Sequence, residues 1–178
     1  MHEVIFHIPE GVTVTKEGDL MTVKGSKGSL SRIMHHPAVE IVVEEGAVKI
    51  STESTRRRVY ALLGTYNAHL HVMAKGVTEG YEYHMKVVYN HFPIQVKVAG
   101  DRVEIANFLG EKQARYAKIV EGVKVKVQGD ELILNGIDRE KIGNTAANVE
   151  QACKVRTRDP GVCRVGIYIT RRDNEQGE

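Results

Sequence analysis

The chain has 178 residues, of which 42% are hydrophobic and 27% are charged, a composition typical of a folded globular protein rather than a disordered one. Its formal net charge of +2 is nearly neutral, so any argument for a nucleic-acid partner depends on where the charges lie. The chain does not open with a basic segment and an apolar run, and no apolar stretch approaches the roughly 18 residues of a membrane span. We therefore expect a cytoplasmic protein with no membrane partner.

The first half of the chain alternates apolar and polar residues in four short stretches, and this period of two is typical of strands with one buried face. Turns at residues 17–19 and 45–46 separate the stretches into hairpins, since Gly adopts positive φ and Asp bonds its own backbone. The predicted strands read VTV at 12–14, MTV at 21–23, VEIVV at 39–43 and VKI at 48–50.

One helix follows these strands, because apolar residues recur at helical spacing between residues 59 and 73. Gly76 comes after this stripe and is a natural C-cap, and a strand reading YEYHMKVVY follows at 81–89. The stripe consists of Val59, Leu62, Leu63, Tyr66, Leu70 and Met73.

The loop GSKG at residues 25–28 resembles the Gly-x-x-Gly clamp with which KH domains hold nucleotides. That clamp should lie between helices, whereas this loop follows a predicted strand. We therefore favour a plain hairpin loop over a nucleotide clamp at this position.

The second half of the chain repeats the same order of elements. Strands are predicted at 96–98, 103–105, 123–127 and 132–134, with turns at 100–101 and 129–130. A helix with Asp138 as its N-cap follows, and a last strand reads RVGIYIT at 164–170. The buried stripe of this helix consists of Ile142, Ala146, Val149 and Cys153.

A shift of 84 residues superimposes the two halves. It places His7–Pro9 on His91–Pro93, residues 39–43 on 123–127, and 48–50 on 132–134. We therefore predict an α+β fold of two tandem duplicated domains, each a mostly antiparallel β-sheet packed on one main α-helix. The expected ranges are 1–80 for the N-terminal repeat, 81–172 for the C-terminal repeat and 173–178 for a polar tail. We expect the halves to be separate folding units joined near Tyr89–Pro93.

The sequence contains no pattern that favours an enzyme, a cofactor or a small-molecule substrate. It has no Gly-x-Ser-x-Gly elbow and no phosphate-binding lysine loop. His69 and His71 are two residues apart on a predicted helix and cannot share one metal ion. Cys153 and Cys163 lack the spacing of a metal knuckle, and we expect both to be free thiols, with Cys153 in the core.

Basic residues gather in three places, and this clustering indicates the kind of binding partner more clearly than the net charge does. Six cations lie between residues 154 and 172 against the single acid Asp159, Arg56–Arg58 open the first helix, and a third group surrounds Tyr116. Lys and Arg neutralise phosphates and an interleaved Tyr can stack on an unpaired base, so the pattern favours RNA binding; a solvated surface is the plainer alternative. The predicted RNA-binding residues are Lys112, Arg115, Tyr116, Lys118, Lys154, Arg156, Arg158, Arg164, Arg171 and Arg172.

Several longer motifs agree, in order, with one known family. GVTEGYEYHMKVVYNHFPIQV, NFLGEK and NVEQACKVRTRDP followed by GIYI resemble the large-subunit ribosomal protein six family, in its archaeal and eukaryotic branch (protein nine in the eukaryotic naming). The resemblance covers essentially the whole chain. It implies two similar α+β domains, no catalytic activity, and binding of large-subunit ribosomal RNA mainly through the second domain, near the sarcin-ricin loop and the stalk base. The implied partners are that RNA and the neighbouring ribosomal proteins of the stalk base.

The chain departs from the C-terminal signature of this family at three positions. Gly161, Cys163 and Val165 stand where the family usually has Arg, Phe and Asp, although Gly166–Tyr168 match the close of the signature. The first departure removes a cation that the resemblance would assign to RNA. The alternative function is a free-standing duplicated protein-interaction module whose basic patches are incidental. Co-sedimentation with large ribosomal subunits in high salt would separate the two.

Overall fold

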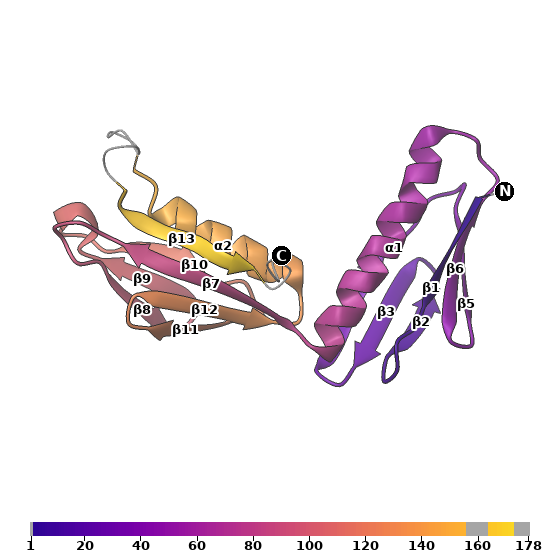
Figure 1. The fold of residues 1–178 in the computed structure, drawn as a ribbon, viewed down its shortest axis with the longest axis horizontal. Coiled ribbons are helices and arrows are strands. Elements are labelled where there is room, and N and C mark those ends of the chain that lie inside the picture. Colours follow the sequence, from indigo (N-terminus) through magenta and orange to yellow (C-terminus); the bar gives the residue numbers. More distant parts are fainter. Residues whose placement is uncertain (1, 156–163, 173–178) are drawn as a thin grey trace. The chain divides into compact units, whose positions relative to one another are not determined.

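The computed structural model describes residues 2–155 and 164–172 (Figure 1). The chain divides into two compact units, residues 1–80 and 81–178. Five residues named above, Arg156, Arg158, Asp159, Gly161 and Cys163, lie outside the described residues, as does the polar tail at 173–178.

Unit 1 packs two small antiparallel sheets against one helix. The sheets have the strand orders β1-β6-β5 and β2-β3-β4, and α1 contacts β1, β3 and β6. Its core includes Phe6, Val23, Ile50, Leu63 and Leu70. The elements are β1 (His2–His7), β2 (Thr13–Glu17), β3 (Leu20–Gly25), β4 (Gly28–Ile33), β5 (Glu40–Glu44), β6 (Ala47–Thr52) and α1 (Arg57–Thr78).

The helix α1 ends later than its sequence predicts, so Gly76 as C-cap is wrong. The helix continues to Thr78, and Gly80 is the glycine that takes a positive φ, of 79°. The GSKG loop joins β3 and β4 as a plain hairpin, as favoured above, and its tip reaches the end of α1. The Lys27 amide donates to the Val77 carbonyl at 2.9 Å and the Ser26 hydroxyl donates to the Thr78 carbonyl at 3.4 Å. These donors satisfy carbonyls that the helix itself leaves open.

Unit 2 has the same plan with one more strand. The strand orders are β11-β12-β7-β13 and β10-β9-β8, and α2 contacts β7, β10, β12 and β13. Asp138 is the N-cap of α2, as predicted, and its carboxylate accepts from the Glu140 amide at 2.9 Å. The elements are β7 (Tyr81–Val88), β8 (Gln95–Ala99), β9 (Arg102–Ala106), η1 (Phe108–Gly110), β10 (Arg115–Lys118), β11 (Lys124–Gln128), β12 (Glu131–Gly136), α2 (Arg139–Ala152) and β13 (Gly166–Arg172).

The predicted α+β fold of two duplicated domains is confirmed, but the junction near Tyr89–Pro93 is wrong. The strand β7 comes before that junction, yet it lies at the centre of the unit 2 sheet and pairs with both β12 and β13. Tyr83, Met85 and Val87 point from it into the core of unit 2. A cut after residue 90 would therefore remove a central strand from unit 2.

Candidate nucleic-acid interface

A turn with unfavourable backbone angles stands at the start of the candidate site. Asn107 and Leu109 both have left-handed backbones, with φ values of 59° and 52°. Residues with a side chain rarely adopt this region, and such conformations cost about 1–3 kcal/mol unless the surroundings hold them. The Asn107 side-chain amide donates to the Pro93 carbonyl at 3.1 Å, and Phe108 is fully buried. The turn thereby fixes the Phe108 ring and the residues that follow it.

Arg115, at the start of β10, lies on this turn. Its guanidinium carbon is 4.1 Å from the centre of the Phe108 ring. The Glu111 carboxylate accepts two bonds from it, one from Nε at 2.8 Å and one from Nη2 at 2.5 Å. Nη1 donates to the Ala152 carbonyl at 2.9 Å and to the Lys154 carbonyl at 3.4 Å, at the end of α2. Arg115 therefore joins the strained turn to the first residues of the basic segment.

The electrostatics of this pair follow from the bidentate contact. The hydrogen bonds from Arg115 lower the pKa of the Glu111 carboxyl below its ordinary value, and the same bonds raise the pKa of the Arg115 guanidinium. Both groups are therefore charged over the physiological range, and Arg115 is committed to intramolecular bonds rather than available to a ligand.

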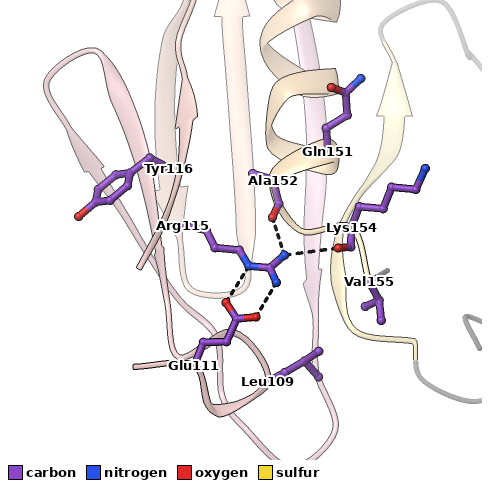
Figure 2. Close-up of a pocket in the computed structure, with 8 residues that line it drawn as sticks. All are labelled: Leu109, Glu111, Arg115, Tyr116, Gln151, Ala152, Lys154 and Val155. Atoms are coloured by element: carbon purple, nitrogen blue, oxygen red, sulfur yellow. Dashed lines mark hydrogen bonds and ion pairs between the residues drawn. The ribbon is translucent and has the colours of Figure 1, made fainter. Parts of the chain in front are cut away.

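An open recess of about 570 Å³ lies beside Arg115, as Figure 2 shows. This volume falls within the range of ligand pockets. The Lys154 and Gln151 side chains extend on one side of the guanidinium and the Tyr116 ring lies on the other. Tyr116 is 57% exposed, so its ring is accessible for stacking. The lining residues are Leu109, Glu111, Arg115, Tyr116, Gln151, Ala152, Lys154 and Val155.

The structure brings some of the predicted RNA-binding residues together and separates others. Tyr116 also lines a neighbouring recess of about 330 Å³ with Asp101, Arg102 and Lys118, so Tyr116 borders both recesses. Lys112 is exposed between η1 and β10. Arg164 precedes β13, whereas Arg171 and Arg172 end it, about 25 Å away at the rise of a strand. None of these three arginines lines either recess.

Sequence reasoning missed the acid and the amide of this site. Glu111 was part of the quoted NFLGEK motif, and its spacing of four residues from Arg115 was the available signal for an ion pair. Gln151 is the penultimate residue of α2 and is exposed. Cys153 is buried, as predicted, and burial raises the pKa of its thiol to about 12. Val165, where the resembled family usually has Asp, is also buried.

The described residues contain neither a group of potential metal ligands nor a membrane-spanning helix. Within residues 2–155 and 164–172, no three His, Cys, Asp or Glu side chains are grouped so that they could hold a metal ion. No helix in the same part of the chain is long and apolar enough to cross a membrane. Two duplicated α+β domains, the second with an open recess lined by Arg115, Tyr116 and Lys154, define the class of two-domain proteins to which the chain belongs.

Comparison with known proteins identifies the family within this class. The model of the family Ribosomal protein L6 matches two stretches of the chain, residues 8–80 and 92–162, one for each repeat. The chain belongs to the ribosomal protein L6 family, as the resemblance predicted. The two separate matches agree with the internal duplication.

Curated relatives from archaea are similar over nearly their whole length. The protein of Methanocella arvoryzae named "Large ribosomal subunit protein uL6" is 53% identical over 164 residues, which cover 92% of this chain and 93% of the relative. Proteins of the same name are 49% identical over 173 residues in Methanospirillum hungatei, covering 97% and 98%, and 48% identical over 171 residues in Ignicoccus hospitalis, covering 93% and 92%.

Proposed function

We propose that this chain binds large-subunit ribosomal RNA through unit 2, near the sarcin-ricin loop and the stalk base, and contacts the ribosomal proteins there. Membership of the ribosomal protein L6 family makes it a structural, non-enzymatic component of the large subunit of the cytoplasmic ribosome. The proposal adds to this role the position of the RNA contact, both on the ribosomal RNA and on this chain. The family resemblance suggests the location, and the surface of unit 2 suggests the residues.

One observation carries the proposal: Tyr116 of β10 and Lys154, which are far apart in the sequence, line one recess of unit 2, and Tyr116 lines a neighbouring recess with Lys118. A cation that neutralises a phosphate releases counterions, and an exposed tyrosine can stack on an unpaired base. The exposed Gln151 amide adds a donor and an acceptor at the same place. Together these groups suit a folded RNA that presents both its backbone and single-stranded bases.

Within this interface Arg115 has a positioning role. Its guanidinium makes four hydrogen bonds, two to Glu111 and two to the carbonyls of Ala152 and Lys154, so it fixes the end of α2 from which the basic segment departs. Among the predicted RNA-binding residues near this interface, Lys112, Lys118, Lys154 and Arg164 are exposed cations that can contact phosphates. Arg156 and Arg158, outside the described residues, belong to the same stretch of sequence.

The experiment is a salt titration of binding to protein-free large-subunit ribosomal RNA. Replacing Lys118, Lys154 and Arg164 by Gln should lower the slope of log affinity against log salt by about two to three units, at roughly 0.7–0.9 per lost contact. The matched control replaces Arg56, Arg57 and Arg58, which removes the same charge from unit 1 and should change the slope by less than one unit. A larger loss in the control variant would place the RNA on unit 1.

Location is tested separately by mapping ultraviolet crosslinks on intact large subunits. Nucleotides crosslinked to unit 2 should fall in the sarcin-ricin loop and the stalk base. Crosslinks confined to other parts of the RNA would overturn the location but leave RNA binding in place. If the native protein leaves the large subunit in high salt while other ribosomal proteins stay, the protein-interaction module becomes the better description.

A further inference from the structure

The outer face of the four-stranded sheet of unit 2 carries a second group of cations. Figure 1 shows its strands side by side in the order β11, β12, β7, β13. On the edge strand β11, Val125 and Val127 are paired with the buried Leu134 and Leu132 of β12. Because side chains alternate along a strand, Lys124 and Lys126 point to the opposite face, and both are exposed.

Two further cations share this face because of the strand register. Lys86 of β7 pairs with Tyr168 of β13, and Arg171 of β13 pairs with His84 of β7. Lys86 and Arg171 are both exposed. Lys126, Ile133, His84 and Arg171 form one row across all four strands. The acids on the face are Glu131 and Glu82, and the second is bonded to His84 at 2.7 Å.

The duplication supplies an internal comparison for this face. The strand β5 of unit 1 occupies the same place as β11, next to β6 as β11 is next to β12, and both are edge strands. The inward positions of the two strands carry similar apolar residues, Ile41 and Val43 in β5 and Val125 and Val127 in β11. Their outward positions differ: β5 carries Glu40, Val42 and Glu44 where β11 carries Lys124, Lys126 and Gln128.

This difference is not a requirement of the fold. A charged edge strand resists edge-to-edge aggregation, but a charge of either sign does this, and β5 is an equally exposed edge with acids. Edge protection also fails to account for Lys86 on the central strand β7. The same backbone pairing is therefore compatible with an acidic face in unit 1 and a cationic face in unit 2.

We propose that this sheet face, centred on Lys86, Lys124, Lys126 and Arg171, is a second phosphate-binding surface of unit 2, for the backbone of an RNA strand. Lys124 and Lys126 are about 6.7 Å apart along an extended strand, and neighbouring strands lie about 4.8 Å apart. Ile133 and His84 separate Lys126 from Arg171, and Lys86 pairs with Glu131, so the cations form an array spread over the sheet face. Such an array suits successive phosphates rather than a single ion. The inference rests on the proposed function, because it assumes that RNA is the ligand of unit 2.

The composition of the face favours RNA over a protein partner. Protein interfaces are depleted of lysine and have an apolar or aromatic centre. Tyr168, at 45% exposure, is the large apolar side chain most exposed on this face, whereas the matching face of unit 1 exposes Ile5 and Val42. Lysines as point charges also suit sequence-independent contact with phosphates.

The test uses lysine acetylation of the full-length protein with and without protein-free large-subunit ribosomal RNA, read out by mass spectrometry. Bound RNA should lower the acetylation rate of Lys86, Lys124 and Lys126 at least about threefold. Lys24 of unit 1, an exposed strand lysine, is the reference and should be unchanged. Because the native protein is used, no variant needs to fold.

A charge-removal variant gives the second measurement. Replacing Lys86, Lys124 and Lys126 by Gln should lower the salt slope by about two to three units, while the variant of Arg56, Arg57 and Arg58 loses less than one. If the wild-type protein binds the RNA but these lysines are not protected and the slope is unchanged, the sheet face is not a binding surface and the proposed function stands. If the wild-type protein does not bind the RNA, the proposed function itself fails.

Discussion

Individual side chains of unit 2 have roles that depend on their partners rather than on their type. Arg115 and Lys154 are both cations of the second half, yet Arg115 is held by Glu111 and by two backbone carbonyls, while the Lys154 side chain is exposed. A count of basic residues treats them alike. The structure separates a residue that shapes the interface from one that can contact a phosphate.

The Glu111–Arg115 pair predicts a loss of stability in acid. The pKa of Glu111 is lower in the folded protein, so its stabilising effect is complete above the ordinary carboxyl pKa and disappears as the pH falls through the folded value. The pair is partly exposed, so the effect is at most about 1 kcal/mol. Urea unfolding from pH 7 to pH 3 should show the wild type and Glu111→Gln converging in acid. A constant difference between them would contradict this linkage.

Cys153 is predicted to be chemically inert in the folded protein. Burial raises the pKa of its thiol to about 12, so about one molecule in ten thousand carries the thiolate at pH 8. In a Cys163→Ser variant, iodoacetamide should label Cys153 only at the rate of unfolding, and labelling should become rapid in urea. Rapid labelling under native conditions would show that the end of α2 opens readily.

At the scale of elements, α1 illustrates what local sequence could and could not predict. The alternation of apolar and polar residues and the helical stripes report burial directly, so both helices and most strands were predicted, whereas β1, β4 and β10 were not. The end of α1 was missed because the tip of the β3–β4 hairpin, some fifty residues earlier, determines it. Likewise, the cations of unit 2 were visible in the sequence, but the Arg115 contacts and the shared face of Lys86 and Lys124 depend on strand pairing.

Two glycines of unit 1 give a matched pair of predictions. A Cβ on Gly25 would lie 2.7 Å from Val77 Cγ2 and 2.8 Å from the Val77 carbonyl oxygen, so Gly25→Ala should destabilise the fold by about 1–3 kcal/mol. Gly64 lies inside α1 with nothing within 4 Å of a Cβ, so Gly64→Ala should stabilise by about 0.5–1 kcal/mol. Thermal unfolding of both variants measures the signs, and equal signs would refute the described packing of the hairpin on α1.

For the whole molecule, the division between the units lies at Gly80, and this predicts which fragments fold. Each unit buries its own core residues, so fragments 1–80 and 81–178 should both unfold cooperatively in urea.

Fragments divided at residue 90 are the control for that experiment. Fragment 91–178 lacks β7, the strand that pairs with both β12 and β13, and should not give a cooperative transition. Cooperative unfolding of 91–178 but not of 81–178 would show that β7 does not belong to the core of unit 2.

The place of β7 also has a consequence for the order in which the nascent chain folds. All strands of unit 1 and α1 precede β7, so unit 1 can close as soon as it leaves the exit tunnel. The partners of β7 begin at Glu131 and Gly166, and at about 5–20 residues per second they follow it by roughly 2–9 and 4–16 seconds. Until β12 follows, a strand with Tyr81, Tyr83, Met85 and Val87 on one side has both edges unpaired, and one edge stays unpaired until β13 follows. Unit 2 therefore depends on shielding of this one strand, by a chaperone or by its own following segments, until synthesis is complete.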